Sequence, residues 1–170
     1  MICFSARTGT RFDRTLGRLD SGAGLILLGQ GEGMFSSLDS SQSGLTILGE
    51  NLNSVVGDFD RDGRVDIVAP QTLGQAHYYL GQAEKRGIRV SFASESRLAK
   101  RLGGTVRLTY GDGTASPRRW LHSGDGMLAQ RAAGLVLGYA TWPSEIEFEW
   151  ANGEKQTISV QPETHDYVVQ

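Results

Sequence analysis

The 170-residue chain is poor in cysteine, in proline and in net charge, and each shortage excludes a class of protein. Its one cysteine, Cys3, excludes an internal disulfide framework and any metal site built from several cysteines. Lys and Arg number 17 against 19 Asp and Glu, so the net charge of −2 offers no basic field to nucleic acid or to an anionic membrane. No apolar run reaches the about 18 residues that span a bilayer, and the first residues lack the pattern of a signal peptide. The sequence predicts no nucleic-acid partner and no membrane-spanning segment.

Glycine is abundant, with 23 residues against four prolines, and turn residues recur too often for long helices. This spacing favours many short strands. Residues 87–94 alternate as a strand, and residues 104–115 run from a strand into a Gly-Asp-Gly turn. Residues 144–160 predict a hairpin with Ile146, Phe148 and Trp150 on its core face and Asn152-Gly153 as the positive-φ pair of a type I′ turn. A short helix is predicted only at residues 94–102, and a boundary near residues 85–87.

A short segment recurs 52 residues along the chain. LLGQGE at residues 27–32 aligns with YLGQAE at residues 79–84, and each follows an apolar run. Residues 11–20 likewise resemble residues 58–66, but they carry Arg11 and Thr15 where the second copy has carboxylates. A strand-and-turn unit at such a period is typical of a propeller or another repeat array. We therefore expect a repeated unit whose first copy has no ion site.

Four aspartates crowd the stretch GDFDRDGRVDIV at residues 57–68. Calcium prefers six to eight oxygen ligands at about 2.3–2.6 Å, and alternating carboxylates in a tight loop can converge on one centre. Gly63 would permit the sharp turn, Arg64 would offer its backbone carbonyl while its side chain points to solvent, and Val65 with Ile67 would anchor the next strand. The predicted metal ligands are Asp58, Asp60, Asp62, Arg64 and Asp66, and calcium is favoured over magnesium because nearly all of these ligands are protein oxygens.

The loop has two other possible interpretations, an EF-hand and a solvated acidic turn. It is not an EF-hand, because loop position twelve, where an EF-hand has its bidentate Glu, is Ala69. It can instead be a solvated acidic turn without a metal, as charged loops often are. The strict alternation, the placed glycine and the mutual repulsion of four carboxylates favour the metal.

The same residues carry a family resemblance. Residues 53–70, NSVVGDFDRDGRVDIVAP, resemble an FG-GAP or VCBS repeat, the calcium-loop unit of integrin-type β-propellers, and LLGQGEGMF at residues 27–35 resembles the strand and turn of such blades. Residues 102–130 and 145–160 are similar to the ASPIC/UnbV domain of the cartilage acidic protein family. The resemblance implies a β-blade region with a calcium loop at residues 1–86 and an ASPIC/UnbV-like β domain at residues 87–170. It also assigns the calcium ligands to the four aspartates and the carbonyl of Arg64.

The fold class predicted is all-β, with one to two propeller-like blades followed by a small antiparallel β-sandwich or barrel-like domain. A propeller needs about four to eight blades, so we expect either a piece of a longer protein or a chain that leans on a partner. The resemblance implies an extracellular or periplasmic location.

The function expected is a calcium-binding, non-enzymatic adhesion or assembly module with a protein partner. The alternatives are a structural subunit of a larger envelope-facing complex or an accessory domain of an enzyme. Residues 116–122, SPRRWLH, can offer a weak carbohydrate or anion contact, although arginines in solvent beside one ring are the favoured interpretation. The three histidines, His77, His122 and His165, show no ligand spacing, and no nucleophile motif is present, so catalysis is not expected.

Overall fold

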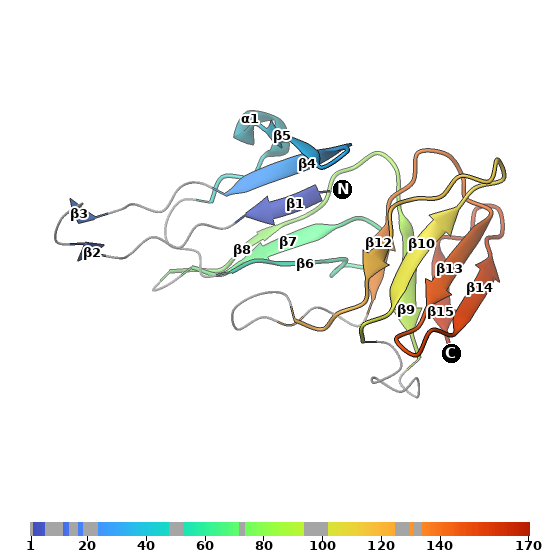
Figure 1. Ribbon diagram of the computed structural model, residues 1–170. Coiled ribbons are helices and arrows are strands. Elements are labelled where there is room, and N and C mark those ends of the chain that lie inside the picture. The colour runs from blue at the N-terminus through green and yellow to red at the C-terminus, as the bar shows by residue number, and fades with distance from the viewer. Residues whose placement is uncertain are drawn as a thin grey trace. The chain divides into compact units, whose positions relative to one another are not determined.

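The computed structural model describes residues 2–5, 12–13, 17–18, 24–47, 53–71, 74–93, 102–124, 130 and 134–170, and it is almost entirely β (Figure 1). The prediction of an all-β chain is confirmed. The helix expected at residues 94–102 falls almost wholly outside the described residues. The chain divides into two compact units. Unit 1 comprises Met1–Val55, Ile67–Tyr79 and Gly126–Ala129, and unit 2 comprises Val56–Asp66, Leu80–Asp125 and Gln130–Gln170.

Unit 1 contains small antiparallel sheets and one turn of helix. The strands β1 (Ile2–Ser5), β4 (Leu25–Gly31) and β5 (Met34–Leu38) form one sheet in the order β1-β4-β5. The strands β2 (Phe12–Asp13) and β3 (Gly17–Arg18) pair with each other, as do β7 (Asp66–Ala69) and β8 (His77–Tyr79). Helix α1 (Ser40–Ser43) starts at the cap Asp39 and ends at Gly44. The small core of unit 1 is formed by Leu45, Ile47 and Ala69, with Ile26, Ile67 and Tyr79 packed against it.

The two aligned segments of the sequence adopt different structures. Residues 25–38 form the β4–β5 hairpin, whose two-residue turn holds Glu32 and Gly33 at φ 50° and 77°. In the second segment only β8 is a strand, and residues 80–87 form none. The sequence alignment led us to expect equivalent strand-and-turn shapes. The two segments do not have them. Propeller blades stay a prediction.

Unit 2 is built around two sheets. The last two residues of β6 (Val55–Gly57) belong to this unit and lead into the aspartate loop. One sheet has the order β11-β10-β13-β14 and is antiparallel, and the other has the order β12-β9-β15. In the second sheet β12 pairs with β9 antiparallel, whereas β15 runs parallel to β9, which is a departure from the predicted antiparallel domain at this one pair among the described strands. The strand bounds are β9 (Ile88–Phe92), β10 (Thr105–Thr109), β11 (Arg119–Trp120), β12 (Leu135–Leu137), β13 (Glu145–Glu149), β14 (Lys155–Ser159) and β15 (Asp166–Val169).

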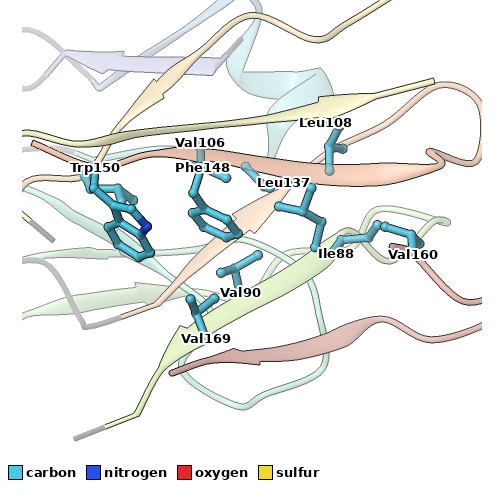
Figure 2. Close-up of a cluster of buried hydrophobic side chains, with 11 residues drawn as sticks. Ile88, Val90, Val106, Leu108, Leu137, Phe148, Trp150, Val160 and Val169 are labelled. Carbon is cyan, nitrogen blue, oxygen red and sulfur yellow. The ribbon is translucent and has the colours of Figure 1, made fainter. Parts of the chain in front are cut away.

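The two sheets of unit 2 face each other across one apolar cluster. Figure 2 shows Phe148 on one side and Val90 with Val169 on the other, all directed into the layer between the strands. The rings of Phe148 and Trp150 stack with centroids 5.5 Å apart. Each fully buried side chain of this size contributes roughly 1.5–3 kcal/mol relative to exposure. Among the described strands these sheets form a sandwich and not a closed barrel.

The hairpin predicted at residues 144–160 is present as β13 and β14, but its turn differs. Ile146, Phe148 and Trp150 are buried as expected. The turn spans three residues, because Trp150 N donates to Glu154 O and Gly153 N donates to Trp150 O. Gly153 has φ 83°, while Asn152 is not in the left-handed region. The prediction of a two-residue type I′ turn is therefore wrong, and a type I turn followed by a left-handed glycine takes its place.

Candidate metal centre

The aspartate loop is shaped by its own carboxylates. Gly63 N donates to Asp58 Oδ2 over 3.1 Å, and Asp62 N donates to Asp60 Oδ1 over 3.1 Å. Gly63 has φ 82°, as predicted for a glycine at the sharp turn. Arg61, at φ 64°, adds a second left-handed position that the sequence did not indicate. The side chains that satisfy these backbone N–H groups are thereby turned toward the inside of the loop.

Three of the predicted ligands come together. Carboxylate oxygens of Asp58, Asp60 and Asp66 all lie within 4.8 Å of one another. Two ligands of one calcium ion lie at most about 5 Å apart, twice the usual calcium–oxygen distance. The spacing therefore suits one hard cation. We call these three residues the aspartate triad; it can hold a metal ion.

Asp66 joins the loop to the chain segment at residues 80–87. It is 1% exposed, and its Oδ2 accepts from Phe59 N and its Oδ1 from Gly81 N, each over 2.9 Å. Gly81 lies so close that a Cβ there would meet Val65 O at 2.4 Å. Gly87 N also donates to Gly63 O over 2.8 Å. Residues 80–87 thus cover one side of the loop and fix the carboxylate that ends it.

Asp58 provides the test of whether a cation fits. Its side chain is only 4% exposed, and its Oδ1 is buried with no hydrogen-bond partner among the described residues. A buried carboxylate oxygen without a partner is costly unless a positive group satisfies it. Asp58 Oδ1 belongs to the same residue that converges with Asp60 and Asp66. A cation held by the triad would give this oxygen its partner, so the residues present fit a metal.

Asp62 faces away from this arrangement, toward Arg64. Its Oδ1 accepts from Arg64 N and its Oδ2 from Arg64 Nη1, both over 2.7 Å. These hydrogen bonds, chiefly that from the Arg64 side chain, hold the pKa of Asp62 below its ordinary value. Arg64 Nε also donates to Ala83 O, so the expectation that this side chain points to solvent is wrong. The ligand roles of Asp62 and of the Arg64 carbonyl stay predictions.

The strand after the loop is anchored differently from the expectation. Ile67 packs against the core of unit 1, as predicted, but Val65 is 37% exposed. The buried positions of β7 are Asp66 and Ala69 instead. The predicted burial therefore fails at Val65, and the neighbouring Asp66 is buried instead, with its carboxylate bonded to the backbone on both sides of the loop.

An open depression in the surface borders the triad. It is lined by residues of the loop and of the segment that covers it: Asp60, Asp62, Arg64, Leu80, Gly81, Gln82, Ala83 and Glu84. Leu80 is about half exposed. Asp60 is the exposed member of the triad, so the triad is open to solvent on its side.

Other candidate residues occupy separate places. His77 stacks near Tyr79 with ring centroids 6.3 Å apart, and the Nδ1 atoms of His122 and His165 lie near backbone carbonyls. Glu147 and Glu149 each form an ion pair with Arg118 at 3.1 Å. Three charged residues near the aspartate loop were not indicated by the sequence: Arg86, Arg89 and Asp166.

No protein-family model matches the chain, and a search of curated proteins found no match. The resemblance to FG-GAP repeats and to the ASPIC/UnbV domain therefore stays a prediction. Within the described residues, no helix combines the length and the apolar character needed to cross a membrane.

Proposed function

We propose that the protein is a calcium-binding, non-enzymatic β-protein in which the ion fixes the aspartate loop of unit 2. Two observations carry this proposal: carboxylate oxygens of Asp58, Asp60 and Asp66 converge within 4.8 Å of one another, and Asp58 Oδ1 is buried with no hydrogen-bond partner among the described residues. Calcium is favoured over magnesium because a loop of carboxylates and carbonyls can supply many protein oxygens, whereas magnesium usually keeps several waters. The ion would act structurally, by binding the folded state.

The role proposed for the stabilised loop is adhesion or assembly with a protein partner. Exposed apolar side chains support it, because Phe59 and Val65 on the loop and Leu80 beside it are each at least 37% exposed. Apolar side chains gathered at a surface are typical of contact sites. The resemblance to FG-GAP repeats followed by an ASPIC/UnbV domain points the same way and adds an extracellular or periplasmic setting to the proposal.

The test is calorimetric titration of calcium, and in parallel magnesium, into the whole chain after removal of metal with a chelator. We expect one calcium site, and at least about tenfold weaker binding in D58N or D60N, because each removes a charged ligand. D62N should weaken binding less, since Asp62 is engaged by Arg64.

The matched control is D112N. Asp112 accepts from Thr114 N in a turn at residues 110–114, and Asn152 makes the same contact with Glu154 N in the turn at residues 150–154. D112N therefore removes one charge and keeps the turn. Unchanged calcium binding in D58N and D60N, or no heat of binding in the wild type, would refute the proposal.

A further inference from the structure

Arg89, on β9, lies between the aspartate triad and the last strand. Its Nε donates to Asp166 Oδ1 over 2.5 Å and lies 3.9 Å from Asp58 Oδ2. One guanidinium thus stands near two carboxylates, one of which is a triad member. The side chains differ in solvent access, since that of Asp58 is 4% exposed and that of Asp166 is 48% exposed. The interaction with Asp58 is therefore the less screened by solvent.

The backbone holds Arg89 in this position. Arg89 and Asp166 are register partners in the parallel pairing of β9 with β15. Arg89 N also donates to His165 O over 2.7 Å, so the base of the side chain is tied to the start of β15. The guanidinium can consequently shift between Asp58 and Asp166 only through its side-chain torsions. Which carboxylate it favours depends on their charges.

Arg86 makes a second link between the loop and β15. Its Nε donates to Asp62 O over 2.7 Å, and its Nη2 lies 3.8 Å from Asp166 Oδ2. The side chain packs over Gly63, where an added Cβ would meet Arg86 Nε at 2.8 Å. Asp166 therefore receives two arginines that also touch the aspartate loop. Among the described residues it is the one carboxylate that forms an ion pair with both arginines.

A cation in the triad and the Arg89 guanidinium are like charges that share Asp58. Each weakens the hold of the other, and the effect is larger in a buried site than in water. Asp166 reduces this competition by binding the guanidinium. Resting on the function proposed above, we propose that Arg89 and Asp166 set the affinity of the triad for its divalent cation, Arg89 as a competitor at Asp58 and Asp166 as the group that draws the competitor away.

The proposal predicts effects of opposite sign. D166N leaves Arg89 to Asp58 and should weaken calcium binding by about tenfold, whereas R89Q removes the competitor and should strengthen it several-fold. In the double variant, D166N should change nothing further, because its effect acts through Arg89. A merely structural role for this pair would make both single variants bind more weakly.

The measurement is calcium calorimetry on the metal-stripped whole chain, with melting curves in chelator to verify folding and D112N as the charge control. This inference would be overturned if the wild type binds calcium and D166N binds it with an affinity within twofold of wild type, or if folded R89Q binds calcium more weakly than wild type. Either result would leave the proposed function standing. No binding by the wild type would overturn both. Should R89Q fail to fold, D166N decides alone, because Asp166 is a half-exposed surface residue.

Discussion

Glu147 lies on β13 between the buried residues Ile146 and Phe148, with its side chain on the opposite face. Its carboxylate accepts from Arg107 Nη2 over 2.7 Å and from Arg118 Nη2 over 3.1 Å. The hydrogen bond from Arg107, assisted by the charges of both arginines, lowers the pKa of Glu147 below its ordinary value of 4.5. The ionised form is thus bound more favourably in the folded state than in the unfolded state.

This shift predicts a contribution to acid unfolding. A carboxyl whose pKa is lower in the folded state adds stability above its ordinary pKa, and the contribution is lost as the pH falls through the lowered value. Between about pH 6 and about pH 3 the wild type should lose more free energy of unfolding than E147Q does. The measurement is urea unfolding across this range. E145Q, two residues away on an exposed position of the same strand, is the control, and equal pH dependence in wild type and E147Q would contradict the prediction.

The candidate site was predictable at residues whose contacts are local. Asp58 and Asp60 each satisfy a backbone N–H within five residues, so their alternation and Gly63 carry the loop geometry in the sequence itself. Asp62 shares that spacing, but Arg64 binds its carboxylate, an ion pair that the pattern did not reveal. Asp166 lies 77 residues from Arg89, and no short pattern marks a contact at that separation.

At the scale of elements, the segment at residues 80–87 determines whether the loop can close. G81A would place a Cβ 2.4 Å from Val65 O, a backbone atom that cannot move aside as a side chain would. We expect a loss of about 1–3 kcal/mol in the free energy of unfolding, as for other overpacked sites. Calcium binding should weaken as well, because Gly81 N would be displaced from Asp66 Oδ1.

The matched substitution for G81A is G111A. Gly111 has no atom within 4 Å of an added Cβ and needs no positive φ, so the change should stay within about 0.5 kcal/mol of wild type. Urea unfolding and calcium titration of both variants measure the difference. Equal stabilities, or unchanged calcium affinity in G81A, would show that this segment does not position Asp66.

Strands were predictable where one face is buried. The alternation of Ile88 with Val90, and of Ile146 with Phe148, predicts strands that the structure confirms. The parallel pairing of β15 with β9 was not predictable, because a strand's own pattern does not give the direction of its partner. The alignment of residues 27–32 with residues 79–84 did not predict the structure of the second segment for a related reason. There Gly81 lies against the aspartate loop, whereas the aligned residues at 29–33 form a hairpin turn.

At the scale of the whole molecule, the two units differ in the size of their described apolar cores and in their tryptophan content. The described core of unit 2 includes large side chains such as Phe148 and Trp150, whereas that of unit 1 is Leu45, Ile47 and Ala69. Burial of more apolar surface gives unit 2 the larger driving force for folding. The aspartate triad belongs to unit 2, and so do all three tryptophans, Trp120, Trp142 and Trp150. Tryptophan fluorescence therefore reports on the unit that contains the proposed ion site.

These facts predict that calcium stabilises unit 2 selectively. At a free calcium concentration about 100 times the dissociation constant, binding adds about 2.7 kcal/mol to the folded state. For a chain of this size the midpoint of the fluorescence-monitored melt should rise by about 5–10 °C. Hydrogen exchange should slow at the amides of Phe59, Gly63 and Gly81, which donate to Asp58 and Asp66, and along β10 and β13.

The β4–β5 hairpin of unit 1 is the internal reference for this experiment, and D58N is the variant control. The amides of the β4–β5 hairpin should exchange at the same rate with and without calcium if the ion acts only on the unit that holds the triad. Equal slowing in β4, β5, β10 and β13 would contradict selectivity and show that the chain opens as one cooperative body. Slowing confined to the three loop amides would instead show that the ion orders the loop without raising the stability of the sandwich, because global opening would then remain as frequent as before.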